Sequence, residues 1–152
     1  MGRMNWSRIL FAGLLAGLVI DSGEYLLHLI VLPDKWKAAM QKLNLTPVPA
    51  SREFLALTAA GLLLGAVTLW LYAAIVPRYG ARARTAILAA LGLWIPGYFL
   101  GLAAMLLEGI LPLDIVILSM TAGLAELVCG ALLGRLIYAD ASSASKGEEV
   151  AT

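Results

Sequence analysis

The chain has 152 residues, of which 61% are hydrophobic and 14% are charged, whereas a soluble domain is roughly 45–50% apolar and about 25% charged. This composition excludes a soluble globular domain, and the net charge of +1 argues against a nucleic acid as a partner. The single cysteine, Cys129, excludes an intramolecular disulfide redox centre, and the single histidine, His28, excludes haem held by two histidines of one chain. The sequence names no cofactor.

Four apolar segments are long enough to cross a membrane, because a hydrocarbon core of about 30 Å needs about 20 apolar residues in a helix. They are residues 9–32, 54–76, 85–107 and 113–138. We therefore predict an all-α integral membrane protein, a four-transmembrane-helix bundle within residues 1–140, with the lipid bilayer as its first partner. Residues 141–152 are small and polar and are predicted to form a disordered tail.

The connection from Pro33 to Glu53, between the first two spans, is the only long one. Within it, Trp36, Met40 and Leu43 follow the spacing of one helical face. This spacing predicts a short amphipathic helix on the outer membrane interface, ended by the prolines that follow it. The alternative is an ordered loop without a function of its own.

Lysine and arginine residues are distributed seven to four between the two sides of these four spans. The larger group comprises Arg3, Arg8, Arg78, Arg82, Arg84, Arg135 and Lys146, and the smaller group comprises Lys35, Lys37, Lys42 and Arg52. Because the side with more cations stays in the cytoplasm, we predict a multi-pass protein of the cell (inner) membrane with both termini cytoplasmic.

Each predicted span contains one G-x-x-x-G sequence. Glycine has no Cβ, so helix backbones can approach closely and gain dispersion contacts where lipid supplies no hydrophobic driving force. We expect these glycines to pack helices against one another. They are Gly13 and Gly17, Gly61 and Gly65, Gly97 and Gly101, and Gly130 and Gly134.

The first span carries ionisable residues along its glycine stripe. Asp21, Glu24 and His28 fall within about 60° of one another on a helix, and Glu126 of the antiparallel fourth span is expected near the depth of Asp21. Since a charge at the bilayer centre costs about 2.5–3.5 kcal/mol on insertion scales, such residues normally face the bundle interior. We predict a buried acidic pocket in the outer half of the bundle. Its candidate ligand- or proton-binding residues are Asp21, Glu24, His28, Glu126 and Glu108, and its candidate lining residues are Thr58, Ser119, Tyr25 and Met105.

The three mid-span acids have no Lys or Arg at their depth, so they cannot all be ionised cheaply. At least one is expected to carry a proton at neutral pH unless a cation is bound. The plainer alternative is a hydrogen-bond network that only locks the bundle. Glu108 is as readily interpreted as a solvated loop acid and His28 as an interfacial residue, while Tyr98 is more typical of packing or of an aromatic belt.

The leading functional hypothesis is a cavity that binds or transports a proton, a cation or a small amphiphilic ligand. This site resembles in principle that of the small multidrug resistance transporters, which also place a glutamate in the first of four spans. The resemblance covers that feature alone, because this chain is longer and carries several acids. Transport would imply a homo-oligomer, since four helices enclose little volume.

Two other classes stay open. The acids and the histidine could instead hold zinc, manganese or ferrous iron, in which case the ligands would be Asp21, Glu24, His28 and Glu126. Alternatively, the chain is an accessory or scaffolding subunit, whose glycine faces pack against a partner membrane subunit. This hypothesis predicts that one G-x-x-x-G face points outward. No nucleophile, phosphate loop or redox pair is recognisable, which argues against an enzyme.

Overall fold

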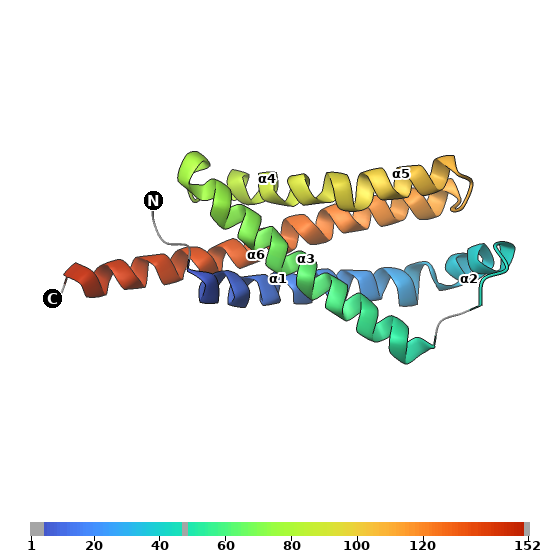
Figure 1. Cartoon of the computed structure of the whole chain (residues 1–152), viewed down its shortest axis with the longest axis horizontal. Helices are drawn as coiled ribbons and strands as arrows, with labels where there is room; N and C mark the ends of the chain where they lie inside the picture. Colours follow the sequence, from blue (N-terminus) through green and yellow to red (C-terminus); the bar gives the residue numbers. More distant parts are fainter. Residues whose placement is uncertain (1–4, 47–48, 151–152) are drawn as a thin grey trace.

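The computed structural model describes the backbone of residues 5–46 and 49–150, and the side chains of these residues as far as Tyr138. Every regular element within these ranges is a helix (Figure 1). The elements are α1 (Trp6–Leu26), the π-helical turn η1 (Leu27–Val31), α2 (Pro33–Lys42), α3 (Ala50–Tyr79), α4 (Ala83–Trp94), the π-helical turn η2 (Ile95–Phe99), α5 (Leu100–Leu107) and α6 (Leu113–Val150).

Within these described residues, four helical segments are long and apolar enough to span a membrane. They begin and end within four residues of the segments expected from hydropathy, and they cover Trp6–Val31, Ala50–Tyr79, Ala83–Leu107 and Leu113–Tyr138. The prediction of an all-helical chain with four apolar spans is therefore confirmed.

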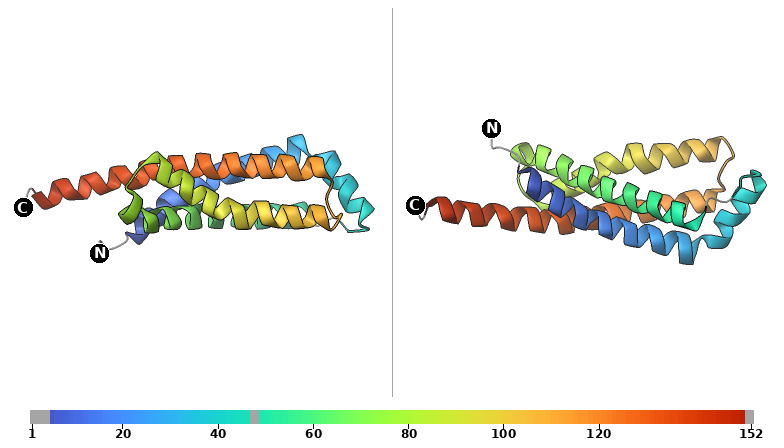
Figure 2. Two further views of the ribbon diagram at one scale, coloured as in Figure 1. Left: turned by 90° about the horizontal axis from the view of Figure 1, so that it is seen from above. Right: turned by 60° about the horizontal axis from the view of Figure 1, so that its bottom comes forward.

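The helices form an elongated bundle in which α1 packs mainly against α3 and α6 (Figures 1 and 2). The third span runs beside α6, and α3 crosses α1 obliquely. The start of α1 and the turn between α3 and α4 lie at one end of the bundle, while α2 and the turn between α5 and α6 lie at the other. Helix α6 projects beyond the bundle to Val150. Residues 141–150, expected to form a disordered tail, thus continue this helix, and their disorder in solution stays a prediction.

The long first connection contains the expected short helix, α2. Pro33 occupies its first turn, where the missing N–H is not needed. The helix packs on the end of the bundle, where Ala39 is buried with Leu32, Ile115 and Val116. Trp36 of this helix stacks on the imidazole of His28 with the ring centroids 5.4 Å apart.

Glycines bring α1 and α3 into backbone contact. A Cβ at Gly13 would lie 2.6 Å from the Cα of Ala66, and a Cβ at Gly17 would lie 3.0 Å from the carbonyl oxygen of Gly61. A Cβ at Gly65 would overlap the backbone of Gly17. This close crossing determines which residues of α1 face α3.

The glycines of the fourth span pack against the opposite side of α1. A Cβ at Gly130 would lie 2.9 Å from the carbonyl oxygen of Ala16, and one at Gly134 would lie 3.0 Å from that of Ala12. Helix α1 is therefore held between two small-residue contacts.

The glycines of the third span behave differently. A Cβ at Gly97 or Gly101 would meet no described atom within 4 Å. We expected these two glycines to pack against another helix, but within the described part of the chain they do not. The stripe that they form points away from the bundle, because the inward face of this span is occupied by Trp94 and Tyr98, which pack on the core.

Candidate functional site

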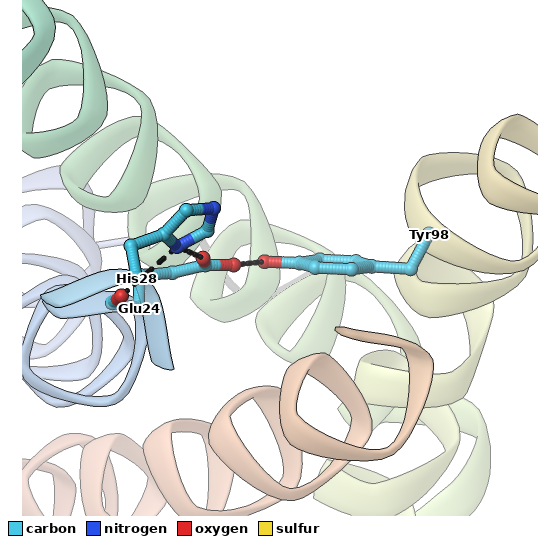
Figure 3. A network of polar contacts seen from close by, with 3 residues as sticks. All are labelled: Glu24, His28 and Tyr98. Carbon is cyan, nitrogen blue, oxygen red and sulfur yellow. Dashed lines mark hydrogen bonds and ion pairs between the residues drawn. The ribbon is translucent and has the colours of Figure 1, made fainter. Parts of the chain in front are cut away.

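A network of three polar side chains joins the first and third spans (Figure 3). The hydroxyl of Tyr98 donates a hydrogen bond of 2.7 Å to Oε1 of Glu24. Nδ1 of His28 lies 3.1 Å from Oε2 of the same carboxylate and 3.0 Å from the backbone oxygen of Glu24. Since both of these oxygens are acceptors, Nδ1 carries the proton that they share. Glu24 is thus contacted at both carboxylate oxygens.

Both π-helical turns contribute to this network. His28 lies in η1 and Tyr98 lies in η2, two residues after Pro96. The turn at η2 accommodates Pro96, which cannot donate a backbone hydrogen bond. Single π-helical turns inside α-helices are frequent at functional sites. The irregular backbone of the two spans therefore coincides with their polar contacts.

Glu126 approaches the same network from α6. It is buried, with 8% of its surface exposed, and a Cβ at Gly23 of α1 would overlap its side chain. It is close enough to Glu24 and His28 to interact with both electrostatically. Its Oε2 is buried without a hydrogen-bond partner among the described side chains. A second carboxylate therefore adjoins the Glu24 network with an acceptor oxygen unused.

The side chains of Asp21 and Glu126 contact different helices. The carboxylate of Asp21 lies against α3, where a Cβ at Gly61 would overlap it, whereas Glu126 lies over Gly23. Positions 21 and 23 are separated by about 160° around an α-helix. Asp21 and Glu126 therefore do not meet directly across the bundle. Asp21 is also 8% exposed, with Oδ2 buried and unpartnered within the described part of the chain.

Tyr98 is the site residue that sequence reasoning assigned to packing. Its ring crosses α6 at Gly123, where a Cβ would lie 2.9 Å from the ring carbon that carries the hydroxyl. Its hydroxyl joins the third span to Glu24 of α1. The signal that could have found it is the adjacent Pro96-Gly97, which marks irregular backbone in the middle of a span.

The remaining candidate residues have separate environments. Ser119 is 7% exposed and its hydroxyl has no partner among the described residues. Tyr25 packs on Phe54 with ring centroids 5.4 Å apart, and Thr58 is half-buried on α3. Met105 is 43% exposed, and Glu108 is exposed at the end of α5. The structure thus gathers Glu24, His28 and Glu126 with Tyr98, but it leaves Met105 and Glu108 on the surface, because their stripe faces outward with Gly97 and Gly101.

Apolar clusters enclose the polar network on two sides. Towards the chain termini it is followed by a core that includes Ile20 and Leu127, both with 0% exposure. Towards α2 it is followed by Leu27, Leu32 and Ile115, all of them buried. Electrostatic interactions strengthen where water is excluded, so these clusters make the protonation and pairing of the carboxylates energetically important.

The described side chains are not arranged to ligate a metal ion. The residues described with side chains contain no group of three or more His, Cys, Asp or Glu that could hold a metal ion. Cys129 is exposed on α6.

Comparison with known proteins identifies no relative, because no family model, curated protein or solved structure matches the chain.

Proposed function

We propose that this chain is a multi-pass inner-membrane protein that binds, and in an oligomer transports, a proton or a small organic cation at the network of Glu24, Glu126, His28 and Tyr98. The observation that carries the proposal is the second carboxylate. Glu24 is already contacted by a tyrosine and a histidine, yet Glu126 adjoins it with a buried oxygen that no described group satisfies.

The cost of burial favours a functional interpretation of this arrangement. An ionisable residue within a span is expensive, whereas Ser, Thr or Asn could supply structural hydrogen bonds at lower cost. A proton or a bound cation would satisfy the free oxygen of Glu126 and reduce its repulsion with Glu24. Asp21 and Ser119 offer two further unpartnered oxygens within the described bundle.

The direction of the chain in the membrane supports the same proposal. The side with seven Lys and Arg residues is the one that contains the turn between α3 and α4, so we place it in the cytoplasm. Helix α2 and the His28 side of the network then face the outside. The ligand would enter the network from the α2 side.

A second candidate, an accessory or scaffolding subunit, is favoured by one specific observation. This hypothesis requires a glycine face that points outward, and the Gly97 and Gly101 face meets no described atom within 4 Å. Such a face suits close contact with another membrane helix. The metal-binding alternative lacks a comparable observation.

The proposal is tested with the purified full-length protein in detergent. Its thermal stability is measured across pH with and without tetraphenylphosphonium, an organic cation. We expect stabilisation by the cation, since a ligand that binds the folded state at about 100 times its Kd adds about 2.7 kcal/mol. Glu24→Gln and Glu126→Gln should abolish this stabilisation.

Glu108→Gln is the matched control, because it removes the same charge from an exposed position. It should leave the stabilisation intact. The network has only a structural role if the cation stabilises all variants equally. The same conclusion follows if neither the cation nor pH changes the thermal stability of the wild type. Subunit function would then be tested by crosslinking through Gly101→Cys in a Cys129→Ala background.

A further inference from the structure

A cavity lies outside the acidic network, at the α2 end of the bundle. It has a volume of about 500 Å³, which is within the range of about 300–1,000 Å³ typical of small-molecule sites. One wall is the α2 helix, and the other is formed by the end of α5, the following turn and the start of α6. It is separate from the proposed cation site.

One face of α2 supplies its wall of the cavity. Lys35, Ala38, Ala39 and Lys42 line it, at the i, i+3, i+4, i+7 spacing of a single helical face. Lys37, which is on the same helix, does not line it. The face therefore combines a small apolar centre with a lysine at each end.

The opposite wall is mainly apolar. It includes Leu106, Ile110, Leu111 and Pro112. This wall lies at the boundary of the membrane-spanning segments, because the third span ends at Leu107 and the fourth begins at Leu113. The cavity consequently lies at the depth where lipid headgroups meet the hydrocarbon region.

The charges at the cavity favour an anionic group. Lys35 forms an ion pair with Asp114, across the cavity, so these two charges offset each other. Lys42 has no ion-pair partner among the residues described with side chains. The cavity also borders the start of α6, where the helix dipole adds positive potential. The net local charge is positive beside an apolar wall.

We propose that this cavity binds an anionic phospholipid, with the phosphate beside Lys42 and the start of α6 and the first part of an acyl chain against the apolar wall. Its depth, its amphipathic lining and its unpaired lysine together indicate this class of ligand. The inference is independent of the cation site, because it uses none of the residues of the Glu24 network.

The test compares lipid retention by charge-matched variants. The full-length protein is reconstituted in vesicles of equal parts phosphatidylcholine and phosphatidylglycerol, extracted in mild detergent and analysed by native mass spectrometry. We expect the wild type to retain phosphatidylglycerol preferentially. Lys42→Gln should lower this retention about fivefold, because one lysine near an anionic lipid surface is worth about a factor of five in binding.

Lys37→Gln is the control, since it removes the same charge from the other face of α2 and should retain lipid like the wild type. Ala38→Trp, which fills the cavity without changing charge, should also lower retention. Equal retention by Lys42→Gln and Lys37→Gln would overturn the proposal. Glycerol phosphate, which carries the phosphate without an acyl chain, should not compete. Effective competition would show that the site takes a free phosphate compound instead of a lipid.

Discussion

Glu24 has a different partner at each carboxylate oxygen, and neither partner is a permanently charged residue. A tyrosine hydroxyl contacts one oxygen and an imidazole contacts the other. A buried charge is costly unless it is paired and hydrogen-bonded, so these two contacts explain how this acid is tolerated within a span. They also make the charge of the pair depend on whether the imidazole is protonated.

Removing the tyrosine hydroxyl should weaken the bundle measurably. Tyr98→Phe keeps the ring over Gly123 but removes the donor to Glu24. Hydrogen bonds between membrane helices contribute about 0.6 kcal/mol on average and up to about 1.7 kcal/mol, and we expect a loss of unfolding free energy within this range. The measurement is reversible unfolding in bicelles. Tyr79→Phe, at a tyrosine that is 52% exposed, should change nothing, and equal effects of the two variants would show that the hydrogen bond adds no stability.

The passage of Tyr98 across α6 should depend on the absence of a side chain at Gly123. A Cβ there would overlap the ring, and overpacking of this kind costs about 1–3 kcal/mol. Gly123→Ala should therefore destabilise the protein more than Tyr98→Phe does. In a Tyr98→Ala background the same substitution should be nearly neutral. Additive effects in this double-mutant cycle would contradict the contact.

At the scale of elements, four equivalent glycine motifs have unequal roles. The motif of α1 meets that of α3 at a backbone crossing, and the motif of α6 packs on the other side of α1. The motif of the third span faces outward. The same four-residue spacing thus packs helices within the chain in the first, second and fourth spans, and in the third span it leaves a surface that lipid or another helix must cover.

This difference predicts opposite responses to the same substitution. Gly65→Ala places a methyl group into the backbone of Gly17 and should cost about 1–3 kcal/mol in unfolding free energy. Gly101→Ala meets open space and should be neutral or slightly stabilising in the monomer. Unfolding in bicelles at low protein concentration measures both. A larger loss for Gly101→Ala would mean that its face is packed against another helix even under these conditions.

At the scale of the whole molecule, the two ends of the bundle carry different elements. The turn between α3 and α4 and the start of α1 share one end, and α2 lies at the other. From the distribution of Lys and Arg we propose that the end with the turn between α3 and α4 is cytoplasmic. The cation proposal depends on this proposed orientation, since it puts α2 and the approach to His28 on the outer side. The lipid proposal depends only on the depth and lining of the cavity.

Cysteine labelling measures the orientation directly. In a Cys129→Ala background, Thr46→Cys follows α2 and Ala81→Cys lies in the turn between α3 and α4, and both positions are exposed. An impermeant maleimide added to intact cells should label position 46 only, and both positions after permeabilisation. Labelling of position 81 in intact cells would show that the bundle has the opposite orientation, with the cation site on the cytoplasmic side.

Hydropathy was sufficient to predict the helical spans and their bounds to within a few residues. Periodicity was sufficient to predict the short helix at Pro33–Lys42. Both kinds of feature depend on local composition. Hydropathy and periodicity also identified Glu24, His28 and Glu126 as residues that belong inside the bundle, since ionisable residues are rarely left facing lipid. The partner of each acid could not be obtained in this way. Which neighbour a helix face meets depends on crossing angles and on close contacts between residues far apart in the chain, as at Gly61 against Asp21 and Gly123 against Tyr98. Tertiary packing therefore decided that Asp21 and Glu126 lie on different sides of α1, that Tyr98 joins the network, and that Glu108 faces outward with Gly101.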